Sequence, residues 1–489
     1  MSVARQVFQQ RSSRCLVLGV SAKRILYGFF VCMLFFGSDA TANDGRLADA
    51  VQQQDVTTVE QLLGQRIDVN KVQPDGTTAL HWAAHWNDLK IASSLIQAGA
   101  NLDAANRYGS TPLLLASENG SAPLIKMMMT AGADPNLSPT GEPPIMIATR
   151  TGNIEAVRAL VAAGAEVNGT EMWRGQSALM WAAAGNFPEL VSFLIEQGAT
   201  VDASSPGGFT PLLFAAREGA SDAARVLVNR GANLDITLKD GSGALATAIK
   251  HLHYELAAYL LRSSASPTAT DQAGATPLHI LVEARNPSAR DALQMPTGNV
   301  DSLELMKQLL DAGADPSRRT LEVPDRPTNE RAILIDVGVN LGGATPFLLA
   351  AKGADVPALR LLLSYGADRT LRTLQQVTPL MVAAGIGYIE SNDAGASTES
   401  EILETLSFLL DLGVGINDSS IHGQTALHGS VYRGNNAIVR FLVDHGAMFK
   451  MSDVYGRTPL ILAEQGFNHM GHYRREDQAV LLRALKARQ

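Results

Sequence analysis

Apolar positions along most of this chain recur three or four residues apart within short segments, a spacing that favours amphipathic helices. In the stretch 109–132 the pattern predicts two short helices joined by a turn. Thr111 and Pro112 indicate where the first helix begins, because threonine is a good N-cap and proline is tolerated at the first helical position. Gly109 and Gly132 mark the flanking turns, since glycine adopts a positive φ without strain. The stretch therefore predicts a helix–turn–helix unit.

This unit repeats along the chain. The phrase DGTTALHWAA, which begins at residue 75, recurs with variation, and the Pro or Ala after its Thr position falls at 79, 112, 144, 178, 211, 244, 277, 346, 379, 426 and 459. Most steps between these markers are 32 to 34 residues, and a second phrase such as LIQAGANLD follows at a fixed distance. Helices of about ten residues are marginal alone, so such units must stack into one continuous core with protected ends.

A period near 33 residues, with a T-P-L-H phrase and a closing G-A-D, resembles the ankyrin repeat. The resemblance implies an all-α solenoid of some eleven helix–turn–helix units, joined by β-hairpin or turn loops. It also implies a non-enzymatic scaffold that binds a partner along a concave groove. The predicted organisation is a capping repeat at 43–74, regular repeats at 75–283, further repeats at 343–454 and a C-terminal capping repeat at 455–489.

The period is interrupted in two places. Pro277 and Pro346 are 69 residues apart, and Pro379 and Ala426 are 47 apart. The excess predicts inserted loops around one repeat at 284–342 and an inserted loop at 385–400. Insertions in solenoids lie on the surface and often on the binding face. Their Asn, Pro, Ser and Gly content fits ordinary loops, and partner-specific elements are the alternative.

The N-terminus differs in character from the repeats. Five basic residues and no acidic residue occupy positions 1–24, the apolar run ILYGFFVCMLFFG follows, and Ala40-Thr41-Ala42 resembles a cleavage site. This order predicts a signal peptide at 1–42 that is cleaved near Ala42, with an uncleaved anchor as the alternative. A leader on an ankyrin array favours a bacterial source, and the expected location is the periplasm or the exterior.

Removing the leader changes the charge and the cysteine content. The remaining chain has 35 basic and 47 acidic residues, and both cysteines are lost with the leader. Such an acidic chain repels nucleic acid. The expected partner is a protein or an extended peptide, without nucleic acid and without an integral membrane segment in the mature chain, whereas the oligomeric state is not indicated.

His81 and His85 are four residues apart, as in a metal site on a helix. Trp82 stands where a zinc protease has its glutamate, and no third ligand lies nearby, so neither a metal nor another cofactor is predicted. The resemblance implies instead that His81, like His279 and His428, braces the turn by hydrogen bonding. Trp82 falls on an apolar position of the repeat and is predicted to be buried.

The partner-binding residues are predicted at positions that change character from unit to unit. His85 and Trp86 occupy two such positions at the end of a first helix, and aromatic residues occupy several hairpin tips. Exposed aromatic and arginine side chains are frequent anchors of interfaces, and ordinary variation of a solvent-facing surface is the alternative. The predicted contacts are His85, Trp86, Tyr108, Trp173, Arg174, Phe209, Arg217, Tyr432 and Tyr455.

Two other functions remain open at this level. A hydrolytic enzyme with its site in the inserted loops would use Asp301, Glu304, Asp325 or Glu330, but these loops contain neither histidine nor cysteine. A structural spacer in an envelope complex is the third possibility. No catalytic motif was found elsewhere in the chain, so a binding module is the favoured interpretation.

Overall fold

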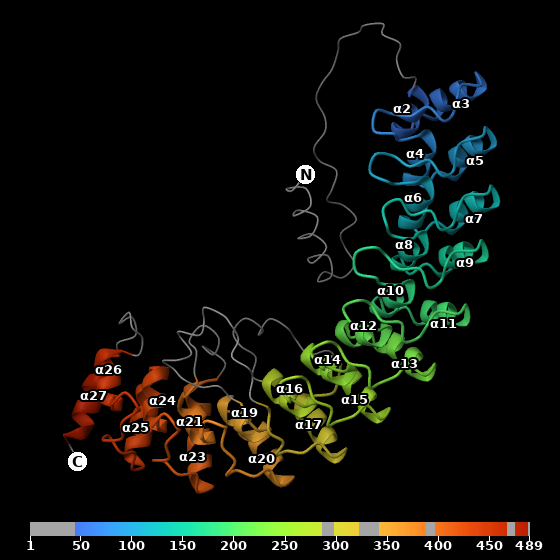
Figure 1. Ribbon diagram of the computed structural model, residues 1–489. Coiled ribbons are helices and arrows are strands. Elements are labelled where there is room, and N and C mark those ends of the chain that lie inside the picture. Colours follow the sequence, from blue (N-terminus) through green and yellow to red (C-terminus); the bar gives the residue numbers. More distant parts are fainter. Residues whose placement is uncertain (1–44, 286–297, 322–341, 388–396, 467–474, 488–489) are drawn as a thin grey trace.

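The chain forms a curved solenoid of paired helices that stack in sequence order (Figure 1). This computed structural model describes residues 45–285, 298–321, 342–387, 397–466 and 475–487. The predicted signal peptide at 1–42 and most of the predicted inserted loops lie outside these ranges. The first pair consists of α2 (Arg46–Gln52) and α3 (Val56–Gly64), which lie within the stretch 43–74.

Eleven further helix pairs follow within the described residues, each with an inner and an outer helix. Figure 1 shows the inner helices on the inside of the curve and the outer helices on the outside. The inner helices are α4 (Ala79–His85), α6 (Pro112–Glu118), α8 (Pro144–Arg150), α10 (Ala178–Ala184), α12 (Pro211–Glu218), α14 (Ala244–Lys250), α16 (Pro277–Arg285), α19 (Pro346–Lys352), α21 (Pro379–Ala384), α24 (Ala426–Arg433) and α26 (Pro459–Gln465). The outer helices are α5 (Leu89–Gln97), α7 (Ala122–Thr130), α9 (Ile154–Ala162), α11 (Pro188–Glu196), α13 (Ser221–Asn229), α15 (Tyr254–Arg262), α17 (Ser302–Asp311), α20 (Val356–Ser364), α23 (Glu399–Asp411), α25 (Asn436–Asp444) and α27 (Glu476–Lys486). The predicted all-α solenoid is confirmed.

The segment before each inner helix projects as a finger, by which we mean the hairpin-like turn between one outer helix and the next inner helix. In the described ranges the fingers contain turns and a single isolated β-bridge, between Thr170 and Ser177, rather than extended strands. Neighbouring fingers are joined through their backbones, as where Arg107 N donates to Asp75 O at 2.7 Å. These contacts align the fingers along one edge of the inner helices.

The beginnings of the inner helices follow from their sequences. Thr111 Oγ1 accepts a hydrogen bond from Leu114 N at 3.2 Å, and Pro112 occupies the first turn, as predicted. Gly109 and Gly132 have φ values of 76° and 94°, which only glycine adopts without strain. The predicted helix boundaries of this unit are therefore confirmed.

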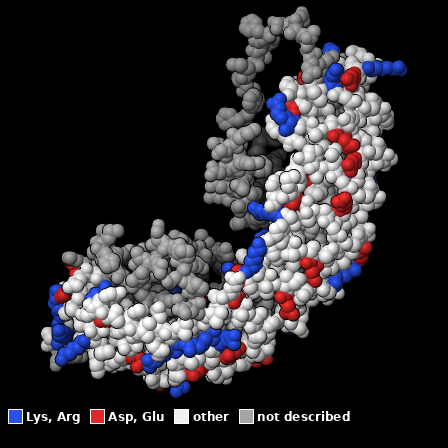
Figure 2. All heavy atoms as spheres, viewed as in Figure 1, with Lys and Arg blue, Asp and Glu red and all other residues white. Residues whose placement is uncertain are grey.

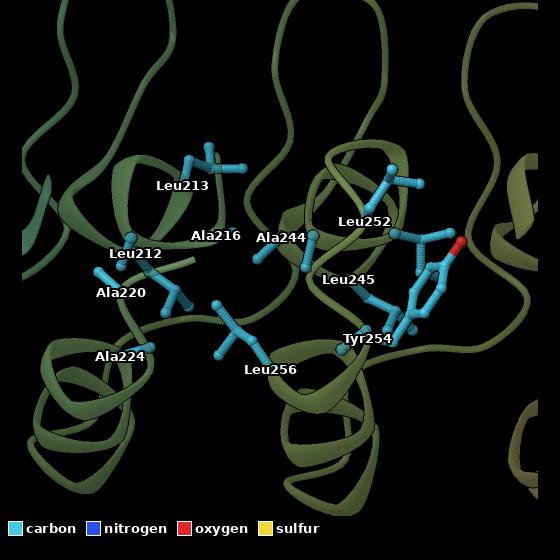
Figure 3. Close-up of a cluster of buried hydrophobic side chains, with 14 of the residues drawn as sticks. Leu212, Leu213, Ala216, Ala220, Ala224, Ala244, Leu245, Leu252, Tyr254 and Leu256 are labelled. Carbon is cyan, nitrogen blue, oxygen red and sulfur yellow. The ribbon is translucent and has the colours of Figure 1, made fainter. Parts of the chain in front are cut away.

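The core lies between successive helix pairs and runs the length of the described chain. Figure 3 shows one such layer, in which Leu212 and Ala216 of α12 face Ala244 and Leu245 of α14, with Leu256 of α15 below them. Alanine at these positions lets the inner helices lie close together, and leucine fills the space between the layers. Each pair thus buries its apolar side only against its neighbours.

Asparagine side chains add a polar connection between successive repeats. Asn168 Nδ2 donates to Gly198 O at 2.9 Å, and Asn168 Oδ1 accepts from Thr200 N at 2.9 Å. One amide therefore satisfies both a helix-terminal carbonyl and a backbone N–H of the next repeat. The same pair of bonds is made by Asn70, Asn136 and Asn417.

The histidines of the T-P-L-H position brace adjacent repeats. His81 Nδ1 lies 2.7 Å from Thr78 Oγ1 and accepts from Thr78 N, and Nε2 lies 2.9 Å from Ser110 O of the next finger. Since a backbone N–H points at Nδ1, the neutral ring carries its proton on Nε2 and donates it to the carbonyl. His279 and His428 make equivalent contacts, which confirms the predicted bracing role.

Acid should destabilise the solenoid through these histidines. Burial lowers the pKa of His279 from 6.5 to about 4, and burial also lowers the pKa of His81 and His428. As the pH falls, the unfolded chain takes up the proton first. The contribution of the neutral histidine to the free energy of unfolding is therefore fully present above pH 6.5 and is lost progressively between pH 6.5 and 4. For His279 alone the loss is on the order of 3 kcal/mol.

The measurement is the thermal midpoint of the full chain on both sides of pH 6.5, compared with a His279→Gln variant. The variant should be less stable near neutrality, yet its midpoint should depend less on pH in this window. Identical pH dependence in both proteins would refute the assignment.

Candidate functional site

The candidate site is the concave face, which is made of the fingers and the exposed sides of the inner helices (Figure 1). Side chains four and seven residues after the N-cap of an inner helix lie on this face. The fourth position holds Trp82, Trp181, Phe214 and Thr247, and the seventh holds His85, Glu118, Arg150, Arg217, Lys250, Glu283 and Lys352. A helical turn separates the two positions, so each repeat contributes one side chain to each of two parallel rows.

Three aromatic rings cluster at the end of α4. Trp82 and Trp86 are stacked with ring centroids 6.5 Å apart, and the His85 ring lies 4.6 Å from Trp86. Trp86 is 44% exposed and, with Val56 and Leu89, forms an apolar surface at the turn between helices. Trp82 was predicted to be buried, but it is only half-buried, because no helix covers the concave face there. Its Nε1 donates to Gln73 Oε1 at 2.8 Å.

Three of the four aromatic residues predicted at the finger tips are exposed, whereas Phe209 is half-buried against Phe214. Tyr108, Trp173 and Tyr455 have exposed fractions of 73%, 65% and 63%, and Arg174 is exposed beside Trp173. The buried Glu171 holds the tip that carries these two residues, since its carboxylate accepts from Trp173 N at 2.6 Å and from Arg174 N at 2.8 Å. Charge-assisted bonds of this kind fix the backbone of the tip.

The predicted contacts do not form a single patch. The fingers precede the inner helices, whereas Trp86 caps the end of α4, so the tip aromatics and Trp86 lie at opposite ends of these helices. A helix of this length spans about 10 Å at 1.5 Å per residue. The aromatic residues therefore line two margins of the concave face, with the two rows of inner-helix side chains between them.

The prediction for Tyr432 is wrong, because this residue is only 2% exposed. Gly429 stands at the fourth position of α24 and leaves the helix surface open. A helical side chain points back toward the N-terminus, so Tyr432 covers this space and its hydroxyl accepts from Gln424 Nε2 at 3.0 Å. Tyr432 is a packing residue in this repeat.

A charged cluster that was not predicted lies between α6 and α10. Arg150 Nη1 is 2.8 Å from Glu142 Oε1, and the Arg150 guanidinium lies 5.4 Å from the centre of the Trp181 ring. Burial raises the pKa of both Glu118 and Glu142, and the positive charge of Arg150 opposes this effect. The signal in the sequence was available, because Arg150 occupies the same position of the repeat as Arg217.

The structure brings together two of the predicted residues, Phe209 and Arg217. The Arg217 guanidinium lies 5.1 Å from the centre of the Phe209 ring and 4.8 Å from that of Phe214. Arg217 Nε also donates to Glu218 Oε1 at 2.8 Å. Phe209 and Arg217 line a hollow of about 370 Å³ whose other walls come from the next finger and from α14, including Lys239, Thr247, Lys250 and His251. Sequence reasoning missed these last four residues.

Neither a metal centre nor a catalytic group is apparent in the described ranges. No group of three metal-ligating side chains occurs among these residues. Asp301 caps α17 by accepting from Leu303 N and Glu304 N, and Glu304 binds Gln308, so both candidate acids have structural contacts. Asp325 and Glu330 lie outside the described residues. No described helix combines the length and the apolar character that a membrane span requires.

The chain belongs to the ankyrin repeat family. The family model described as "Ankyrin repeats (3 copies)" matches residues 47–139, 114–205, 145–240, 212–320 and 395–473, which together cover more than half of the chain. The repeats between 342 and 387, outside these matches, have the same helix pairing in the structure. Ankyrin repeats form protein-interaction domains, and the predicted family is confirmed.

Two related proteins illustrate how this repeat is shared. The chain is 27% identical over 302 residues to the E3 ubiquitin-protein ligase KEG of Arabidopsis thaliana, which is 59% of this chain but 18% of that protein. It is 37% identical over 211 residues to the palmitoyltransferase ZDHHC13 of Mus musculus, which is 42% of this chain and 33% of that protein. The chain therefore spans only a minor part of each relative.

A solved structure with the same repeat is the human ASB11 ankyrin repeat domain. It is 27% identical and matches 45% of this chain and 98% of that domain, with a TM-score of 0.41.

Glu171 should be required to order the tip that carries Trp173 and Arg174. Replacing it by glutamine removes a charged acceptor from several backbone N–H groups, which should cost about 1–3 kcal/mol and speed the exchange of the Trp173 and Arg174 amides. Hydrogen exchange of the variant and the parent chain measures this. A Glu189→Gln change on the exposed surface of α11 is the control and should leave both amides protected as before. Unchanged exchange in the Glu171 variant would contradict the proposed anchoring.

Proposed function

We propose that this protein is a non-enzymatic scaffold that binds a protein, or an extended peptide, along its concave face. The observation that carries the proposal is the row of side chains that successive inner helices contribute to one continuous surface, flanked by exposed aromatic residues at the fingers and at α4. Aromatic and arginine side chains supply most of the binding free energy in many interfaces. Their enrichment here, where packing does not require them, supports a binding surface.

The margins and the centre of this surface suit different parts of a partner. Trp86, Tyr108 and Trp173 offer large apolar areas to apolar side chains, whereas Arg150 and Arg217 are held over aromatic rings and offer directed hydrogen bonds. An extended segment that crosses several repeats would meet both kinds of group. The inserted loops at 284–342 and 385–400 are proposed as additional contacts.

An exported location is part of the proposal. It rests on the order of a basic segment, an apolar run and a small-residue site in residues 1–42, and on the loss of both cysteines with that leader. The periplasm or the exterior of a bacterium fits this leader. A spacer role in an envelope complex is the second candidate, and the length of the stack of helix pairs favours it. A hydrolytic enzyme is a weaker candidate, because the carboxylates of Asp301 and Glu304 already form hydrogen bonds within α17 and at its N-terminus.

The binding role is tested by affinity capture from the native source with the tagged mature chain. A specific partner should be recovered by the parent chain and by a Val480→Ala control on the exposed surface of α27, and should be lost or strongly reduced with Trp86→Ala or Trp173→Ala. Truncating an interface anchor typically costs more than about 2 kcal/mol, or roughly thirtyfold in affinity. Recovery that is equal for all four proteins would argue against the concave face.

The leader is tested by the mass of the protein isolated from its source. Export with cleavage should remove the segment up to Ala42, so that the mature chain begins near Asn43 and contains no cysteine. A protein that retains Cys15 and Cys32 and fractionates with the cytoplasm would refute the proposed location.

A further inference from the structure

The hollow between α12 and α14 has the character of a binding pocket for a single anionic group. It lies on the concave side, in the angle between two neighbouring fingers and the two inner helices that follow them. Figure 2 shows basic side chains along the inner edge of the bend, at the level of the middle repeats. The pocket is named here the α12–α14 pocket, and its chemical groups come chiefly from Phe209, Arg217, Lys239, Thr247 and Lys250.

The first observation is the arrangement of charge. Arg217, Lys239 and Lys250 bring three positive charges to the pocket, and neither lysine forms an ion pair with a carboxylate of the described residues. Glu218 bonds to Arg217, and Asp240 lines the wall. The pocket and Glu218 thus combine three cations with two carboxylates, and the carboxylate of Glu283 on the next inner helix also acts on Lys250. With these carboxylates close by, a singly charged carboxylate is a better match than a doubly charged phosphoryl group.

The second observation is the orientation of Arg217. Its guanidinium lies over the adjoining Phe209 and Phe214 rings, whose centroids are 5.1 Å apart, and the bond from Nε to Glu218 restricts its orientation. No acceptor among the described residues bonds to its two terminal amino groups. A guanidinium that is already oriented loses little freedom when it binds a carboxylate, and its planar donors match the two carboxylate oxygens.

The third observation is an unsatisfied hydroxyl. Thr247 lines the pocket, is 4% exposed, and its Oγ1 has no hydrogen-bond partner in the described part of the chain. Three other repeats, including the preceding one, place Trp82, Trp181 or Phe214 at this position. The small threonine opens the hollow, and a buried hydroxyl without a partner is unfavourable until an acceptor is supplied. Its Oγ1 is itself shielded, so the hydroxyl would bond to an acceptor in the hollow after rotation about χ1.

From these observations we infer that the α12–α14 pocket receives an acidic side chain, Asp or Glu, from an extended segment of the protein partner. The inference rests on the proposed function. The carboxylate accepts from the terminal amino groups of Arg217 and from Lys250, and the hydroxyl of Thr247 completes the set. The apolar part of the same side chain packs against Phe209. Because the chain as a whole has a net charge of −8, an acidic segment is repelled elsewhere and directed to this pocket.

The experiment selects peptides on the full tagged chain from a phage-displayed library of random linear peptides. The enriched peptides should share Asp or Glu at one position. A synthetic peptide of the enriched sequence, with a fluorescent label, is then compared with a copy in which that acid is replaced by Gln. Loss of the acid should weaken binding by about tenfold or more, the usual size for a desolvated charge pair.

Variants of the pocket assign the effect to its residues. Arg217→Gln and Lys250→Ala should each weaken binding of the acidic peptide by about tenfold, and Thr247→Val, which keeps the shape, by severalfold. The Gln peptide should bind the parent chain and the Arg217→Gln variant almost equally, since the interacting pair is already broken. Lys307→Ala is the matched control, because this exposed lysine on the outer helix α17 carries the same charge far from the pocket. It should leave binding unchanged.

The outcomes separate this inference from the proposed function. Two results would overturn the pocket assignment and leave the scaffold function intact. The enriched peptides could lack a common acid, or replacing the acid by Gln could weaken binding as much in the Arg217→Gln and Lys250→Ala variants as in the parent chain. Tighter binding when phosphoserine replaces the acid would overturn the choice of a carboxylate. Enrichment of no peptide by the full chain would count against the scaffold function, and the inference would fall with it.

Discussion

Contact between neighbouring repeats is the constraint on which every other feature of this protein depends. An inner helix of seven residues, such as α4 or α6, is too short to be stable alone, and its apolar side is covered by its own outer helix and by the pairs on either side. Alanines at the inner-helix contacts set the close spacing, and the Asn168-type amides join carbonyl and N–H groups across it. The stability of each repeat therefore depends on its contacts with the adjacent repeats, and removing one repeat exposes an apolar face on each of its two neighbours.

The same constraint frees the concave face for variation. The residues that face a neighbouring repeat are mostly small or apolar. The seventh position of most inner helices reaches the solvent and varies between His85, Arg217 and Glu283, and the partly or fully buried fourth position beside it accommodates Trp82 or Thr247. A pocket such as that between α12 and α14 then arises by changing single residues in two adjacent repeats. The scaffold supplies the spacing of the rows, and the sequence of each repeat supplies the chemistry.

The fold could be predicted from the sequence because its determinants are local and recur. Thr111, Pro112 and Gly132 specify the ends of helices within one unit, and the period then specifies the stacking. The exposed tips at Tyr108 and Trp173 could be predicted for the same reason, since a turn residue does not pack. The helix ends of this unit and the exposure of Tyr108 and Trp173 were each predicted correctly from the residue's position in the repeat.

The wrong and missed predictions concern residues whose environment depends on a side chain at another position of the repeat or in a neighbouring repeat. Tyr432 occupies an outward position, and its burial depends on Gly429 one turn earlier and on Gln424 in the preceding finger. The α12–α14 pocket likewise combines residues from two repeats, and the period alone cannot show that Thr247 of one repeat lies beside Phe209 and Arg217 of the preceding one. Pairwise effects of this kind require the three-dimensional arrangement.

The asparagines between repeats have a consequence for producing the protein. Asn168 is followed by Gly and Thr170, and Asn417 by Asp and Ser419, so both fit the acceptor sequence for N-linked glycans in a eukaryotic secretory pathway. A sugar would be attached at Nδ2, the atom that donates to Gly198 O or Gly446 O. Glycosylation would therefore place a bulky group inside the junction of two repeats, and the solenoid would weaken at those two joints in such a host but not in one that lacks this modification.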